Sequence, residues 1–149
     1  ANPVHESAAA ALQSLADKMK ENYNLNVIVQ VQPEAAEKLD IHAQGVLFYI
    51  AEEAVGNTRK HAEAEHIWVR IKLATSEICA LEIQDDGVGF DVAAVTGSYE
   101  HRGSLGMVNM RERTELVNGV LHLDSAPGKG TKITILIPLT NEARAKLGV

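Results

Sequence analysis

At residues 78–90 the chain reads Ile78-Cys79-Ala80-Leu81-Glu82-Ile83-Gln84-Asp85-Asp86-Gly87-Val88-Gly89-Phe90. The apolar run that ends at Gln84 predicts a strand, and a carboxylate pair and two spaced glycines follow it directly. The preceding segment, 66–74, alternates apolar and polar residues and is joined to this strand by Thr75-Ser76-Glu77. The two segments therefore predict an antiparallel hairpin that delivers Asp85 at the end of a strand.

Outside the hairpin, hydrophobic spacing predicts further helices and strands. Helices are expected at 7–23 with Ser7 as the N-cap, at 40–62, at 105–118 before Gly119, and at 141–147. Strands are expected at 26–32, 120–124 and 132–139, with a polar connector after Pro33. Residues 91–102 show no clear period, so we expect them to form a lid loop.

Composition limits the fold class and the partners. The 149 residues are 46% hydrophobic and carry a net charge of −6, which fits one globular domain and disfavours nucleic acid as a partner. Cys79 is the single cysteine, so no intrachain disulfide is expected and a cytoplasmic, reducing setting fits best. No run approaches the ~20 apolar residues of a membrane span, and residues 1–10 lack the features of a signal peptide. We expect no direct membrane contact by this domain.

The expected domain organisation is a single catalytic domain over residues 1–149. Within it, an N-terminal helix and strand occupy 1–38, a motif-bearing core occupies 39–139, and a C-terminal tail occupies 140–149.

Polar side chains on the predicted 40–62 helix repeat at helical spacing. Glu53, Asn57 and either Lys60 or His61 are each about one turn apart, so they share one face. An amide oxygen is a hard ligand for Mg²⁺, and a lysine offsets phosphate charge, so this face suits a magnesium triphosphate. Taken alone, the same stripe also fits an ordinary solvated helix face.

Asp85 suits recognition of a purine base. A carboxylate fixed at a strand end can accept a hydrogen bond from the exocyclic amine of adenine, where guanine presents a carbonyl, and Gly87 and Gly89 let backbone approach a planar base. A plain Asp-Asp-Gly turn explains this stretch equally well when it is taken alone. A calcium loop is disfavoured because the glycines come too early and the spaced ligands of an EF-hand are absent.

Two further glycine pairs offer phosphate contacts. Gly103 and Gly106 lie at the start of the predicted 105–118 helix, whose N–H groups can hold phosphate oxygens, although such a pair is more often a loop or capping feature. The Gly-Lys-Gly-Thr segment at 128–131 fits a hairpin turn equally well. Neither a Walker A motif nor a G-x-G-x-x-G fingerprint is present, which disfavours P-loop and Rossmann folds.

The ordered combination of these motifs resembles the GHKL ATPase superfamily, which includes gyrase, Hsp90, MutL and the histidine kinases. The matching motifs are Glu53-x-x-x-Asn57-x-x-Lys60-His61, Asp85-x-Gly87-x-Gly89, Gly103-x-x-Gly106 and Gly128-x-Gly130-Thr131. Within the superfamily, the stretches 52–62, 85–91 and 106–113 resemble the catalytic domains of two-component sensor kinases paired with helix-turn-helix response regulators. The resemblance covers residues 39–139.

The resemblance implies a Bergerat-type ATP-binding fold. This is an α/β (α+β) two-layer sandwich with a mixed, mostly antiparallel sheet and helices on one face, and with ATP between the 40–62 helix and the lid. The resemblance also implies that Asn57 is a ligand of Mg²⁺, that Asp85 takes the adenine amine, and that Thr131 assists through water. The other implied nucleotide-binding residues are Lys60, His61, Gly87, Gly89, Gly103, Leu105 and Gly106. His101 and Arg102 are candidate lid cations that reach the phosphates, although ordinary exposed loop charges explain them equally well. Glu53 is expected to act in catalysis with Asn57, since in the hydrolysing members this glutamate activates water, whereas a kinase delivers the γ-phosphate to a histidine.

The implied function is that of the ATP-binding catalytic domain of a sensor histidine kinase. Such a domain donates the γ-phosphate to a histidine on a separate dimerisation domain, which then serves a response regulator. His5 is not expected to be that acceptor, because only 52 positions separate it from Asn57 (57 − 5) and the first helix and strand fill most of them. The alternatives are an anti-sigma-type serine protein kinase of the same superfamily and a non-catalytic protein-binding module with this fold.

Overall fold

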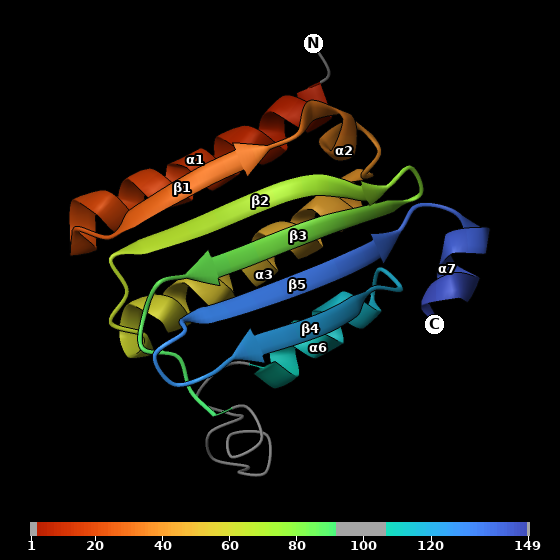
Figure 1. Cartoon of the computed structure of the whole chain (residues 1–149). Helices are drawn as coiled ribbons and strands as arrows, with labels where there is room; N and C mark the ends of the chain where they lie inside the picture. The colour runs from red at the N-terminus through yellow and green to blue at the C-terminus, as the bar shows by residue number, and fades with distance from the viewer. Residues whose placement is uncertain (1–2, 92–106, 149) are drawn as a thin grey trace.

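A five-stranded sheet with the order β1-β2-β3-β5-β4 organises the molecule (Figure 1). The computed structural model describes residues 3–91 and 107–148, and of residues 3–7 only the backbone. The strands are β1 (Asn26–Val31), β2 (His66–Thr75), β3 (Ile78–Asp85), β4 (Val120–Ser125) and β5 (Thr131–Pro138). The pair β1–β2 is parallel and the other pairs are antiparallel, which confirms the mixed, mostly antiparallel sheet and the predicted hairpin.

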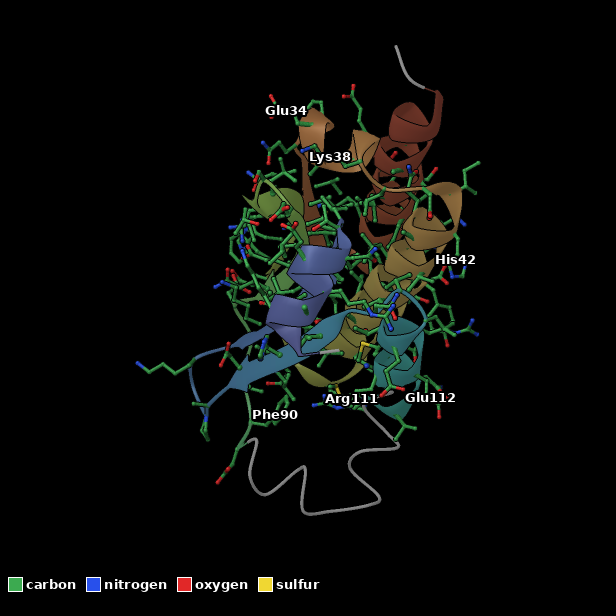
Figure 2. All side chains as sticks on the ribbon, turned by 90° about the vertical axis from the view of Figure 1, so that its right-hand side faces the viewer. Glu34, Lys38, His42, Phe90, Arg111 and Glu112 are labelled. Atoms are coloured by element: carbon green, nitrogen blue, oxygen red, sulfur yellow. The ribbon has the colours of Figure 1, made fainter. Side chains whose placement is uncertain are left out.

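The long helices cover one face of this sheet, as the side view of Figure 2 shows. These are α1 (Pro3–Tyr23), α3 (Ile41–His61) and α6 (Met107–Glu115); the short helices are α2 (Pro33–Glu37) and α7 (Asn141–Leu147). Alternate strand residues such as Val69 and Leu81 are buried and belong to the same hydrophobic core as Ile50 and Val55 of α3. The core therefore lies between the two layers of an α+β sandwich, as predicted.

The opposite face of the sheet is covered by its own charged side chains. Glu82 of β3 is 8% exposed because three cations surround its carboxylate. The nitrogen–oxygen distances are 3.2 Å to Lys72, 3.6 Å to Lys132 and 3.8 Å to Arg70. The carboxylate of Glu82 is thus paired on the sheet face that these helices do not cover.

The elements differ from the sequence predictions by more than one residue at three places. The prediction that Ser7 caps the first helix is wrong, because α1 already begins at Pro3. The connector after β1 is not irregular, since Pro33 begins the short helix α2 and buries Ala35 and Ala36. Helix α6 ends at Glu115 rather than at residue 118, because turn hydrogen bonds follow and Asn118 takes the left-handed conformation (φ 57°).

Across residues 3–91 and 107–148, no helix is both long and apolar enough to cross a membrane. The predicted lid, except for Asp91, lies outside the described residues.

Candidate functional site

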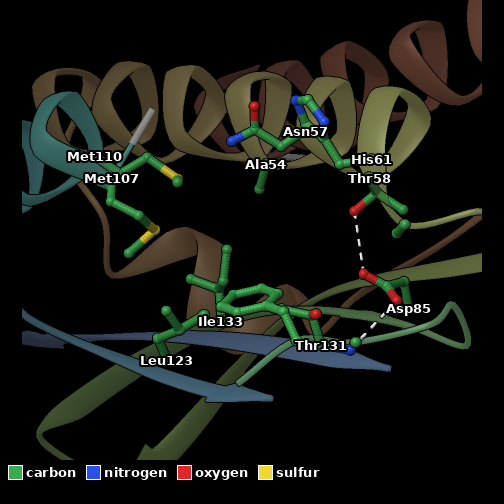
Figure 3. A pocket seen from close by; sticks show the side chains of 13 residues that line it. Ala54, Asn57, Thr58, His61, Asp85, Met107, Met110, Leu123, Thr131 and Ile133 are labelled. Carbon is green, nitrogen blue, oxygen red and sulfur yellow. Dashed lines mark hydrogen bonds between the residues drawn. The ribbon is translucent and has the colours of Figure 1, made fainter. Parts of the chain in front are cut away.

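A cavity of about 200 Å³ lies between α3 and the sheet, beside α6 (Figure 3). Its apolar lining includes Ala54, Met107, Met110, Leu123 and Ile133. Its polar lining includes Asn57, Thr58, His61, Asp85 and Thr131. The cavity is therefore an apolar slot with polar groups at defined places, which is the usual build of a small-molecule site.

Helix α3 forms the upper wall of the cavity in Figure 3. The helix begins at the N-cap Asp40, whose Oδ1 accepts a 2.7 Å hydrogen bond from the N–H of Ala43. Residues three and four positions apart then share a face, which brings Ala54, Asn57 and Thr58 to the cavity, followed by His61 one turn later. Of the polar residues predicted to share one face of this helix, Asn57 and His61 therefore line the cavity.

Asp85 forms the floor at one end of the cavity and is held from both walls. Its Oδ1 accepts hydrogen bonds from the N–H of Gly87 at 2.9 Å and of Thr131 at 3.3 Å. Its Oδ2 accepts a hydrogen bond from Thr58 Oγ1 of α3 at 3.2 Å. A carboxylate oxygen can accept more than one hydrogen bond, so Oδ2 keeps acceptor capacity for a ligand in the cavity.

The two adjacent carboxylates have opposite pKa shifts. Burial raises the pKa of Asp85, whose residue is 5% exposed, and the hydrogen bonds from Gly87, Thr58 and Thr131 only partly offset this rise. At Asp86 burial also acts to raise the pKa, but hydrogen bonds from the backbone and ring of His66 and from the Glu65 N–H outweigh it and lower the pKa. Asp86 therefore ties β3 to the start of β2, whereas Asp85 is the carboxylate presented to the cavity.

The two glycines after these carboxylates make room for neighbouring backbone. A Cβ on Gly87 would lie 2.1 Å from the carbonyl oxygen of Ala62, the residue that follows α3. Gly89 has φ +65°, and a Cβ there would lie 2.1 Å from the carbonyl oxygen of Ala126. The space left by Gly87 is therefore filled by the end of α3, while Gly89 lines the cavity itself.

The structure brings together Asn57, His61, Asp85, Gly89 and Thr131 around the one cavity. Glu53 is half-buried and Lys60 is exposed, and neither belongs to the lining formed by the described residues, because both sit to the side of the 54–58–61 face of α3. The remaining predicted site residues, which lie outside the described residues, are His101, Arg102, Gly103, Leu105 and Gly106.

Sequence reasoning missed two hydroxyl groups at the site. Thr58 follows Asn57 directly and reads as an ordinary helix residue, because its contact with Asp85 joins positions 27 residues apart. Ser125 ends β4, and its Oγ accepts from the N–H of Phe90 at 2.9 Å, donates to Gly130 O at 2.8 Å and lies 2.9 Å from Thr131 Oγ1. The position of Ser125 directly before a glycine-rich turn is the feature of the sequence that could have indicated its role.

The residues that line the cavity fit an adenine nucleotide better than a metal ion held by protein side chains alone. The cavity is smaller than the roughly 300–1,000 Å³ of a pocket for a whole drug-sized ligand, so it suits a base with the remainder of the nucleotide at its mouth. In the part of the chain that the structure describes, no three His, Cys, Asp or Glu residues are grouped to hold a metal. Mg²⁺, which keeps several waters and takes few protein ligands beside phosphate, is compatible with a site that offers Asn57.

Known proteins resemble this chain in sequence and in fold. Residues 43–141 match the family described as histidine kinase-, DNA gyrase B- and HSP90-like ATPase. An uncharacterized sensor-like histidine kinase of Chloroflexus aurantiacus is 51% identical over 68% of this chain and 17% of its own length. The signal transduction histidine-protein kinase/phosphatase DegS of Brevibacillus brevis is 38% identical over 71% of this chain and 26% of its own length.

The fold also resembles a solved histidine kinase domain. That domain, from the Erythrobacter litoralis EL346 blue-light activated histidine kinase, superposes with a TM-score of 0.68 at 19% identity, over 95% of this chain and 67% of its own. In sequence, the chain spans about a quarter or less of the length of the two curated relatives named above.

Proposed function

The chain belongs to the histidine kinase-, DNA gyrase B- and HSP90-like ATPase family, and on this basis we propose that it is the ATP-binding catalytic domain of a sensor histidine kinase. Membership of an ATPase family implies ATP as the nucleotide. The kinase assignment is supported by relatives named as histidine kinases that are identical to this chain at about a third to a half of the aligned positions.

One observation carries the proposal: Asn57 on α3 and Asp85 at the end of β3 line the same cavity from opposite walls. Asp85 would accept a hydrogen bond from the adenine amine, and the apolar side chains Met107, Met110 and Ile133 would enclose the ring. Thr131, whose N–H fixes Asp85, would assist the same contact.

The phosphates would extend from this base pocket toward the stripe on α3. Asn57 would be a ligand of Mg²⁺ through its amide oxygen, and His61, exposed at the end of α3, would meet the phosphates. Lys60, which directly precedes His61, would also contact the phosphates. Glu53, one turn before Asn57, would act with Asn57 in catalysis. Bound Mg-ATP supplies the phosphoryl group, and the protein's part is to position it and to balance its charge.

The partner of this site would be a histidine on a separate dimerisation domain, and the phosphate would then pass to a response regulator. We propose that residues 1–149 act as one catalytic unit, since Leu12 and Leu15 of α1 are buried in the same core as α3 and the sheet. We also propose that this unit works in the cytoplasm.

The test supplies the chain with Mg-ATP labelled on the γ-phosphate and with the separate, histidine-bearing dimerisation domain proposed as its partner. We expect an acid-labile, base-stable phosphate on that domain, and its loss when Asn57→Ala replaces the wild type. An acid-stable phosphate on serine, or no transfer by a chain that binds ATP, would contradict the histidine kinase assignment.

A further inference from the structure

The hydroxyl of Thr58 faces the cavity with its proton already committed. Thr58 Oγ1 donates to Asp85 Oδ2 at 3.2 Å, across the gap between α3 and the sheet (Figure 3). A hydroxyl has one proton and two lone pairs. Toward a ligand, this oxygen therefore offers acceptor capacity.

The hydroxyl proton of Thr131 is also already used in a hydrogen bond, in this case to Ser125. Ser125 Oγ lies 2.8 Å from the carbonyl oxygen of Gly130, and a carbonyl can only accept, so the single proton of Ser125 points there. Ser125 must then accept in its 2.9 Å contact with Thr131 Oγ1, which makes Thr131 the donor. Thr131 consequently also offers lone pairs to the cavity that it lines.

Asp85 completes the set. Its Oδ1 already takes two backbone N–H groups and its Oδ2 takes Thr58, and the ionised group has no proton to donate. The side chains of Asp85, Thr58 and Thr131 thus form a group of three acceptors at one end of the cavity, which we name the acceptor triad.

We infer that Thr58 and Ser125 are positioning residues that make the acceptor triad selective for the 6-amino group of a purine and against a 6-oxo group. This inference deepens the proposed function, on which it rests, by naming the residues that set base selectivity. An amino group brings N–H donors to acceptors that need them, whereas an oxo group brings lone pairs against lone pairs. A site built to hydrogen-bond one polar group discriminates strongly against an analogue that lacks it.

The test compares Mg-ATP with Mg-inosine triphosphate, a nucleotide that carries a 6-oxo group and an N1 proton in place of the 6-amino group and free N1. Calorimetry on the wild type should favour ATP by about 100-fold or more. In Ser125→Ala the Thr131 proton is free to turn toward a 6-oxo group, so this ratio should fall about tenfold. In Thr58→Val, which removes the hydroxyl and keeps the branched shape, ATP affinity and the ratio should both fall about tenfold, and Thr58→Ser should restore them.

Thr134→Val is the matched control. Thr134 lies on β5 opposite Glu82, on the sheet face away from the cavity, so this variant should keep the wild-type ratio. A wild-type ratio in folded Ser125→Ala and Thr58→Val would overturn the inference and leave ATP binding intact. Absence of ATP binding by the wild type would instead overturn the proposed function. Should Thr58→Val fail to fold, an unchanged ratio in folded Ser125→Ala alone overturns the inference.

Discussion

Asp85 and Asp86 are neighbours in the chain and serve different ends. Asp85 points into the cavity, and burial raises the pKa of its carboxyl. Asp86 accepts two backbone N–H groups and the ring of His66, and these bonds lower the pKa of Asp86 despite burial. A buried carboxylate kept at a stability cost is typical of functional sites.

Asp85→Asn should leave the free energy of unfolding at pH 7 unchanged or raise it. The pKa of Asp85 in the folded protein is raised above its ordinary 3.8, so its contribution to stability is complete below that value and is lost as the pH rises through the raised pKa. Asparagine has the same shape and no charge; its carbonyl can accept from Gly87 and Thr131 while its amide donates to Thr58. Urea denaturation at pH 7 measures the change, and a loss of about 2 kcal/mol or more would contradict this account.

Asp86→Asn should lower the free energy of unfolding by about 1 kcal/mol at pH 7. The pKa of Asp86 is lowered, so its contribution is complete above the ordinary 3.8 and is lost as the pH falls through the lowered value. The difference between variant and wild type should therefore shrink in acid. The side chain is 35% exposed, so the ion pair with His66 adds little to the effect of the backbone hydrogen bonds. The asparagine carbonyl can still accept from the two backbone N–H groups, so a variant as stable as the wild type in urea at pH 7 would show that the charge of Asp86 adds nothing to these bonds.

The motif residues of the site could be predicted from the sequence, whereas the residues that hold them in place by hydrogen bonds could not. Asp85 stands out in the sequence because it closes an apolar strand ahead of two glycines. Thr58 and Ser125 do not, since their importance comes from hydrogen bonds between α3 and β3 and between the ends of β4 and β5. Non-local contacts of this kind leave no periodic pattern in the chain.

At the scale of elements, α3 and the loop after β3 contain glycines with opposite requirements. Gly45 lies in α3, where an added Cβ would meet nothing within 4 Å, so Gly45→Ala should raise the free energy of unfolding by about 1 kcal/mol through helix propensity. Gly87→Ala places a Cβ 2.1 Å from Ala62 O and should lower the free energy of unfolding by about 3 kcal/mol. Thermal unfolding of the two variants checks the pair. Equal effects would mean that the loop does not pack against the end of α3 as described.

Element types followed from the sequence more readily than boundaries and pairing did. The hairpin β2–β3 and helix α3 have clear periods of two and three to four, and both were predicted within one residue. Helix α2 was missed because Pro33 both stops a strand and begins a helix. The parallel pairing of β1 with β2 was not predicted, because α2 and α3 lie between these strands in the chain and local patterns cannot specify such partners.

For the whole molecule, the cavity lies between the two layers, with α3 on one side and β3, β4 and β5 on the other. A ligand that binds there contacts both layers and stabilises only the folded state. Mg-ATP at 100 times its dissociation constant should therefore add about 2.7 kcal/mol, or roughly 5–10 °C in Tm for a domain of this size. Differential scanning fluorimetry with Mg-ATP measures this shift, and ATP without Mg²⁺ is the comparison that isolates the contribution of the metal. An unchanged Tm in saturating Mg-ATP would show that the nucleotide does not bind between the layers.

Calorimetric titration of Mg-ATP into the wild type and Asp85→Asn, with Asp86→Asn as the control, tests the central claim most directly. In Asp85→Asn the new side-chain carbonyl would be held by Gly87 and Thr131, so its amide would turn a donor toward the donor amine of adenine. We predict one bound nucleotide for the wild type and for Asp86→Asn, and an affinity weaker by about 100-fold for folded Asp85→Asn. Equal affinity in the wild type and Asp85→Asn would contradict the claim that this cavity reads an adenine base through Asp85.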